Sequence, residues 1–205
     1  SSEAMSVSVK WDGAPAVVCG TNPDNGKFFV GTKSVFAQAA KINYTKKDIA
    51  TNHGTDELGQ KLLKCLVHLK KLNITGVVQG DLLYTDEDIT RKNIDGKPSL
   101  TFTPNTITYA VPEASELGKK IDRAKVGIIF HTTYTGDSLA DMNAQGGADV
   151  NSFTQNPDVF FDNATYKDVS GSAKFTDEET KQFYNGIEKL ETLLNSVPRN
   201  LSSVL

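Results

Sequence analysis

A lysine placed directly before a tight turn is the first feature of the chain that could do chemistry. Ser6 to Lys10 alternate valine with polar residues, so the pattern predicts a short strand with Lys10 on the face opposite the valines. Asp12 and Gly13 then predict a turn, because glycine tolerates the backbone angles that turns require. A free lysine titrates near ~10.4, so Lys10 would become a nucleophile only if desolvation or a neighbouring cation activated its amine.

Composition limits the classes to which the protein can belong. The 205 residues suit one large domain, and 38% hydrophobic with 23% charged residues makes a packed core feasible. The net charge of -3 argues against a histone-like binder of polyanions but leaves a local basic groove open. Cys19 and Cys65 form no C-x-x-C pair, and the three histidines lack metal-ligand spacing. No apolar run approaches the ~20 residues of a membrane span, so we expect a cytoplasmic protein that does not enter a membrane.

A hairpin should follow the first strand and return a second lysine to it. Residues 16–19 and 27–30 are predicted as its two strands, and the connection Asn22-Pro23-Asp24-Asn25-Gly26 has strong turn chemistry. Lys33 comes directly after the second of these strands, so we expect it near the end of the sheet where Lys10 lies. The alternative is an exposed loop lysine, as most lysines are.

A carboxylate interrupts the next predicted strand, residues 77–84. Asp81 lies inside an otherwise apolar segment, where burial without a partner is costly. It therefore either belongs to a site or faces solvent at a strand edge, and we favour the site. A helix from Thr55 to Leu72 precedes this strand, with leucines at helical spacing as core support. Residues 41–52 are polar and are expected to form a surface loop.

The second half of the chain predicts further strands and helices. Asp95-Gly96 is a hairpin-type turn, and residues 99–103 and 106–111 follow as two β segments with a helix over 113–124. Residues 126–134 form the most apolar strand, and we interpret its His131 as a hydrogen-bonded structural histidine because no serine or cysteine nucleophile pattern accompanies it. A capping box at Thr176 opens a last helix. The fold class is therefore α+β, with antiparallel sheets flanked by helices.

Three motifs in order resemble those of one known superfamily. Lys10-Trp11-Asp12-Gly13 resembles the K-x-D-G motif of the covalent nucleotidyltransferases, which include ATP-dependent DNA and RNA ligases and mRNA capping enzymes. Thr32-Lys33-Ser34 is similar to the short basic motif that ends the equivalent hairpin. Gly80-Asp81-Leu82 is similar to the G-E-L motif, with Asp in place of Glu. The resemblance covers roughly Val7 to Val111 and is closest to phage-type ligase-like proteins.

The resemblance implies an ATP-grasp-like adenylation domain over residues 1–205, a fragment or truncated core, that forms a lysyl-AMP intermediate. Lys10 would be the catalytic nucleophile, ATP and Mg²⁺ the cofactors, and DNA or RNA ends the partners, in the cytoplasm of a cell or of a virus-infected host. The family also has an aromatic residue that stacks on the purine, for which Tyr109 is the first candidate and Phe102 the second. Both rings could equally be ordinary side chains of the hydrophobic core. The residues that the resemblance assigns to the nucleotide are Ser8, Val9, Trp11, Asp12, Gly13, Lys33, Asp81 and Tyr109, and those it assigns to the metal are Asp12 and Asp81.

Two motifs expected later in the chain are missing from the sequence. There is no E-G-hydrophobic segment to supply the metal-binding glutamate and no K-x-K pair for the triphosphate. Three readings therefore stay open: an active ATP-dependent ligase-like enzyme, a non-catalytic module that binds a nucleotide or nucleic acid on the same fold, and an unrelated α/β protein in which K-W-D-G is a plain turn.

Overall fold

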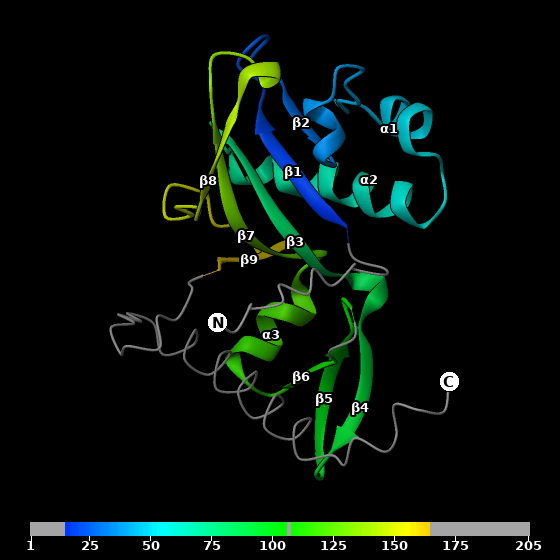
Figure 1. Ribbon diagram of the computed structural model, residues 1–205. Helices are drawn as coiled ribbons and strands as arrows, with labels where there is room; N and C mark the ends of the chain where they lie inside the picture. The colour runs from blue at the N-terminus through cyan, green and yellow to red at the C-terminus, as the bar shows by residue number, and fades with distance from the viewer. Residues whose placement is uncertain (1–14, 106–107, 165–205) are drawn as a thin grey trace, which may run out of the picture.

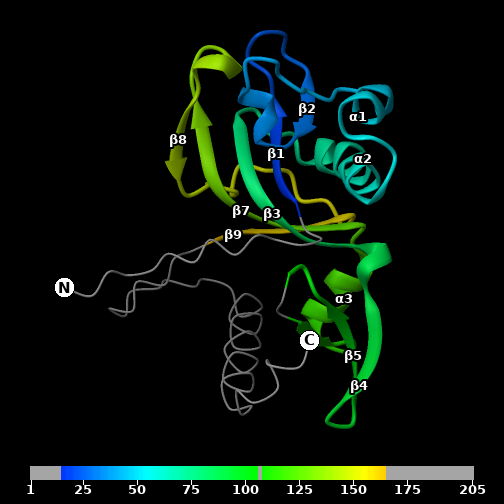
Figure 2. The same ribbon diagram turned by 45° about the vertical axis from the view of Figure 1, so that its right-hand side comes forward.

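The computed structural model describes residues 15–105 and 108–164 of the chain (Figure 1). A six-stranded sheet with two helices forms one part, and a three-stranded sheet with one helix forms the other (Figures 1 and 2). The α+β class predicted from the sequence is confirmed. Among the described residues, no helix has both the length and the apolar character needed to cross a membrane.

The six-stranded sheet has the order β2-β1-β3-β7-β8, and β9 also pairs with β7. Its pairs are antiparallel except β7 with β9, which is parallel. The predicted hairpin is confirmed as the β1–β2 pair. The predicted apolar strand over 126–134 is confirmed as β7, an interior strand of this sheet. The strands are β1 (Ala16–Thr21), β2 (Phe28–Gly31), β3 (Val77–Thr85), β7 (Val126–Thr135), β8 (Asn143–Gly146) and β9 (Val159–Asn163).

Two helices, α1 (Lys46–His53) and α2 (Glu57–Leu69), lie on one face of this sheet (Figure 2). Helix α2 buries Leu62, Cys65 and Leu69 against the sheet, while Leu58 of the predicted stripe is 37% exposed. Helix α1 falls in the segment expected to be a surface loop, so that expectation was wrong. The reason is a capping box, in which Thr45 and Asp48 satisfy each other's backbone amides and start a helix with little apolar periodicity.

The three-stranded sheet is an insertion between β3 and β7. It consists of β4 (Thr90–Ile94), β5 (Lys97–Phe102) and β6 (Tyr109–Pro112), followed by α3 (Glu116–Arg123). The turn between β4 and β5 is the predicted Asp95–Gly96, where both residues have positive φ angles of 52° and 79°. At the base of the insertion, the amide of Asp86 donates to the carbonyl of Lys125. This hydrogen bond joins the segment that enters the insertion from β3 to the segment that leaves it toward β7.

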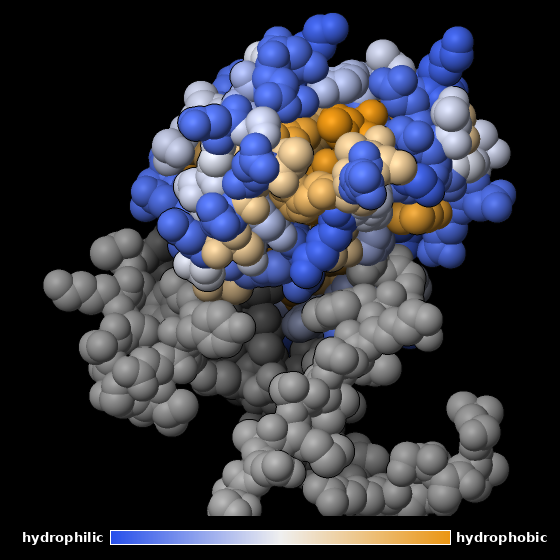
Figure 3. Space-filling model, turned by 45° about the horizontal axis from the view of Figure 1, so that its top comes forward, coloured by the Kyte–Doolittle hydropathy of each residue, from blue (hydrophilic) through white to orange (hydrophobic). Residues whose placement is uncertain are grey.

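Three hydrophobic clusters hold these parts together. The first fills the space between the six-stranded sheet and α2. The second joins the three-stranded sheet and α3 to Leu83, Tyr84 and Ile129 of the large sheet. The third, around Val18, Val77 and Tyr134, lies on the other face of the large sheet from α2. On the face shown in Figure 3, hydrophobic residues gather centrally within a largely hydrophilic surface.

Candidate active site

The candidate carboxylate Asp81 lies on β3, beside the start of β1. Asp81 and Ala16 are direct cross-strand partners, and the amide of Leu82 donates to the carbonyl of Pro15 at 3.3 Å. Pro15 is the first described residue. The K-W-D-G segment, residues 10–13, therefore comes in the sequence just before the position where β1 meets Asp81.

A β-bulge in β7 turns His131 toward Asp81. Gln79 pairs with Thr132 and Gly80 pairs with Phe130, which leaves His131 as the extra residue opposite this step. Regular strands direct neighbouring side chains to opposite faces, but a bulge can re-aim one of them. Here the His131 imidazole and the Thr132 hydroxyl lie on one face, because the two side chains are hydrogen-bonded to each other.

Glycine 80 allows the two strands to approach at this bulge. A Cβ atom at Gly80 would lie 2.6 Å from the carbonyl oxygen of Ile129 and 2.9 Å from a side-chain carbon of Ile128. Contacts this short do not occur between real Cβ atoms and backbone, so one strand would have to shift. Glycine directly before Asp81 is therefore required by the close packing of β3 on β7.

The side chains of Asp81, His131 and Thr132 form a hydrogen-bonded chain. His131 Nε2 lies 3.2 Å from Asp81 Oδ1, and His131 Nδ1 lies 2.8 Å from the Thr132 hydroxyl. An ionised carboxylate only accepts, so Nε2 carries the proton and donates to Asp81. In the neutral ring Nδ1 then accepts from Thr132. The Asp81 and His131 side chains keep 28% and 26% of their surface exposed, so the pair is open to a ligand.

The pair lies between two hydrophobic clusters on one face of the sheet. Cross-strand partners point to the same face, so Asp81 shares its face with Ile129, which packs in the cluster of the three-stranded sheet. Toward the other end, the Tyr134 hydroxyl donates to Gln79 Oε1 at 2.6 Å and Tyr134 packs in the third cluster. A polar, partly exposed pair between two packed regions is well suited to hold a polar ligand in a fixed orientation.

Lys33 lies toward the same end of the sheet as Asp81. β1 and β2 are antiparallel and pair as far as Gly31, so the chain beyond Gly31 runs toward the level of Ala16 and hence of its partner Asp81. Lys33 begins a short 3-10 helix and is exposed. The hairpin thus returns this lysine as predicted from the turn chemistry, while its contact with a nucleotide stays a prediction.

Tyr109, the predicted stacking ring, lies on β6 of the three-stranded sheet. Its ring stacks on Phe102 at a centroid distance of 5.4 Å, and it packs on the second cluster, which includes Ile129. Phe102, the second candidate, is 2% exposed and belongs to that core. The ring that contacts Asp81 is that of His131 on β7, which the sequence predicted to be a hydrogen-bonded structural residue. Its hydrogen bonding was predicted, but its partner could not be, because strand pairing across 50 residues leaves no local signal.

The remaining predicted site residues, Ser8, Val9, Lys10, Trp11, Asp12 and Gly13, lie outside the described residues. Of the two carboxylates assigned to a metal, the structure therefore describes Asp81 alone. In the described part of the chain, no group of three or more histidine, cysteine, aspartate or glutamate residues is arranged so that it could hold a metal ion. Asp81 fits a Mg²⁺ ion that reaches the site with a nucleotide, because Mg²⁺ is commonly held by one or two carboxylates together with substrate phosphates.

The two cysteines are poor candidates for chemistry. Cys19 and Cys65 are both fully buried. Burial raises the pKa of the Cys65 thiol to about 12, with a smaller opposing effect from Lys61, and burial likewise raises the pKa of Cys19. Thiolates are the reactive form, so neither cysteine serves as a nucleophile at neutral pH.

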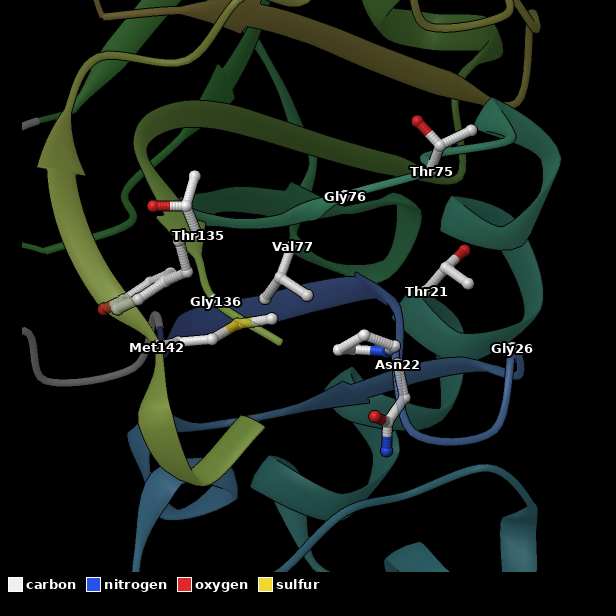
Figure 4. Close-up of a pocket in the computed structure, with 11 residues that line it drawn as sticks. Thr21, Asn22, Gly26, Thr75, Gly76, Val77, Thr135, Gly136 and Met142 are labelled. Carbon is white, nitrogen blue, oxygen red and sulfur yellow. The ribbon is translucent and has the colours of Figure 1, made fainter. Parts of the chain in front are cut away.

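A pocket of the large sheet lies away from Asp81. It has a volume of about 350 Å³ and is formed by the end of β1, the start of β3 and the end of β7 (Figure 4). A second pocket of about 130 Å³ lies between α2 and the insertion. Among the described residues that line these two pockets, neither Asp81, His131 nor Lys33 appears. The candidate active site is therefore identified by its side-chain chemistry and not by a pocket.

Comparison with known proteins assigns the chain to a family without assigning an activity. No curated protein matches the chain significantly. No solved structure does so either. Residues 1–204, nearly the whole chain, match a family of unknown function, DUF6267. The chain belongs to this family.

Proposed function

We propose that the protein is an ATP-dependent, polynucleotide ligase-like nucleotidyltransferase that forms a lysyl-AMP intermediate on Lys10. The fold we propose for it is the ATP-grasp-like adenylation domain. The observation that supports the proposal is the pairing of Asp81 with Ala16, which follows the K-W-D-G motif by three residues in the sequence. Residues 10–13 come just before the strand whose first residue pairs with Asp81.

Two further observations support the proposal. The β1–β2 hairpin directs the chain toward Lys33 at the same end of the sheet, which is the third resembling motif. The Asp81 carboxylate is oriented by His131 and partly exposed, as a carboxylate that meets a ribose or a hydrated metal must be. The replacement of the family's glutamate by Asp81 shortens its reach by one methylene, so a neighbouring polar group that helps to bind the ligand is chemically reasonable.

The proposed reaction has two transfers. The Lys10 amine attacks the α-phosphorus of ATP, a nitrogen–phosphorus bond forms, the bond to pyrophosphate breaks, and the amine loses a proton. The AMP then passes to the oxygen of a 5′-phosphate end, which restores the amine, and a 3′-hydroxyl finally displaces AMP to join the strands. Lys33 would supply positive charge that lowers the pKa of Lys10. Mg²⁺ bound with the nucleotide would offset charge on the phosphates.

The decisive experiment is labelling with ATP that carries a radioactive α-phosphate, in the presence of Mg²⁺. The wild-type chain should gain a covalent label that survives denaturing electrophoresis, and Lys10→Ala should gain none. Lys47→Ala, which changes an exposed lysine on α1, is the matched control and should label normally. Equal labelling of wild type and Lys10→Ala, or labelling of neither, rejects the enzymatic proposal.

The second candidate is a non-catalytic module on the same fold that binds a nucleotide or a nucleic-acid end. It is favoured by the sequence itself, which contains neither an E-G-hydrophobic segment nor a K-x-K pair. In this case ATP should raise the melting temperature of the protein without leaving a covalent label. Testing each of the four nucleoside triphosphates in both assays separates the two candidates and defines the preferred base.

A further inference from the structure

The pocket at the far end of the large sheet has the lining of a binding site for an uncharged ring. Figure 4 shows the side chains of Val77 and Met142 pointing toward one another, with Thr21 and Thr75 on one side of them and Thr135 on the other. Its 350 Å³ lies within the range of ~300–1,000 Å³ that small-molecule sites occupy. The pocket is therefore large enough for a single heterocycle.

Among the described residues, no charged side chain lines this pocket. Its lining consists of threonine, asparagine, glycine, proline, valine, tyrosine and methionine residues. A phosphate or carboxylate would find no cation here, so the lining argues against an anionic group. Val77 is 1% exposed and Met142 packs on its cluster, so the polarisable thioether of Met142 offers the apolar contact to the face of an aromatic ring.

Hydroxyl groups supply polar partners at the rim. The Thr21 hydroxyl donates to the carbonyl of Ile74 at 2.7 Å and keeps its capacity to accept. Within the described residues, no hydrogen bond occupies the hydroxyls of Thr75 or Thr135, and both residues are exposed. A flat ring with donors and acceptors on its edges matches an apolar centre with a hydroxyl rim, and a nucleobase is such a ring.

The pocket and Asp81 lie along the same face of β3. Val77 and Tyr134 line the pocket and pair across β3 and β7. Gln79, which accepts from the Tyr134 hydroxyl, lies on the same face between Val77 and Asp81. Val77 and Asp81 are four residues apart, about 13 Å along an extended strand. A ring in the pocket and a group at Asp81 would therefore belong to different parts of one extended ligand.

We propose that this pocket binds an unpaired nucleobase of the nucleic-acid strand whose end is held at Asp81. The idea rests on the proposed function in one respect, which is that the strand reaches Asp81. The base lies against the partly buried Met142, and the threonine hydroxyls meet its edges. Bases that are not paired can be turned out of a strand and held by side chains.

The variant that tests the pocket is Gly76→Phe. Gly76 lines the pocket, a Cβ atom built there meets nothing within 4 Å, and its φ is outside the left-handed region. The added ring should block the pocket while the protein folds. Ala50→Phe adds the same ring at an exposed position of α1 and is the matched control. Melting temperatures of both variants establish that they are folded.

The measurement is the affinity for a short single-stranded oligonucleotide, determined from fluorescence anisotropy at low salt. Gly76→Phe should bind about tenfold more weakly than wild type, because one base of the strand loses its site. Ala50→Phe should bind like wild type. Equal binding by all three proteins, or no binding by wild type, overturns the proposal.

Three further measurements complete the test: two need no variant, and the third separates this proposal from the enzymatic one. An oligonucleotide that carries 2-aminopurine should change its fluorescence on binding wild type, and an unchanged signal overturns the proposal. If adenosine alone competes as well as the oligonucleotide, the pocket takes a free nucleoside, and the assignment to a strand is rejected. Lysyl-AMP labelling should be the same in Gly76→Phe and wild type. If no label forms in either protein but the oligonucleotide result holds, the enzymatic proposal fails and the pocket survives.

Discussion

His131 Nε2 lies 3.2 Å from Asp81 Oδ1, although 50 residues separate them in the chain. Two features of the sheet produce this contact. Strand β7 pairs directly with β3, and the bulge at His131 brings its side chain onto the face that carries Asp81. Because the imidazole donates to the carboxylate, it limits the directions in which Asp81 can accept a ligand. This relationship leads to the first prediction.

Replacing Asp81 by asparagine should slow formation of the lysyl-AMP adduct by about tenfold to a hundredfold. The estimate follows from the ~1.5–3 kcal/mol attributed to hydrogen bonds that involve a charged group. Asparagine keeps the size of the side chain and an acceptor for His131 but removes the charge. The rate of labelling measures the effect, and the melting temperature serves as the control for folding. An unchanged labelling rate would remove Asp81 from the site.

Replacing Lys33 by alanine should weaken labelling while leaving the fold intact. Lys33 is exposed at the start of its 3-10 helix, so its loss removes little packing. A surface lysine without a function tolerates truncation within ~0.5 kcal/mol, and the same is expected of the Lys47→Ala control. We expect the apparent affinity for ATP to fall about tenfold or more in Lys33→Ala, which corresponds to the ~1.5 kcal/mol at the lower end of the range for a hydrogen bond that involves a charged group. Equal ATP dependence in the two variants would contradict the role of Lys33.

Gly80→Ala should destabilise the protein and disturb the Asp81–His131 pair. The added methyl group would lie 2.6 Å from the carbonyl oxygen of Ile129, so β3 and β7 must separate. Overpacking of this kind costs about 1–3 kcal/mol. Gly146→Ala is the control, since its added methyl meets nothing within 4 Å. Urea unfolding of both variants gives the comparison, and similar midpoints would show that the two strands can move apart freely.

Stability should fall in acid because of the ion pairs at the base of the insertion. Burial raises the pKa of Asp86, but hydrogen bonds and charges from Lys64 and Lys125 outweigh this effect, so the pKa lies below its ordinary value of 3.8. A carboxyl with a depressed pKa contributes stability that is present above the ordinary pKa and is lost as the pH falls through the depressed one. Unfolding free energy should therefore decrease as the pH falls below about 4.

The matched variant for this prediction is Asp86→Asn. It should be less stable than wild type at neutral pH and lose less stability on acidification, since the charge that titrates is absent. Chemical denaturation at several pH values between neutrality and acid measures the difference. Parallel pH profiles for the two proteins would show that other carboxyls, and not Asp86, cause the acid sensitivity.

Local chemistry in the sequence was enough to determine several elements. The Asn22-Pro23-Asp24-Asn25-Gly26 connection predicted the β1–β2 hairpin, and Asp95-Gly96 predicted the β4–β5 turn, because turn residues act through their own backbone angles. The leucine spacing predicted α2, although the structure leaves Leu58 exposed at its start. The capping box of α1, formed by Thr45 and Asp48, is the local signal in residues 41–52 that indicates a helix and not a loop.

Only the tertiary structure decided what surrounds Asp81. The sequence determined that a carboxylate interrupts an apolar strand, and that His131 lies in another apolar strand. It did not determine that these strands are neighbours, because 40 residues of inserted sheet and helix separate β3 from β7. The bulge that turns His131 toward Asp81 arises from the register of that pairing, which long-range packing sets and no short sequence pattern encodes.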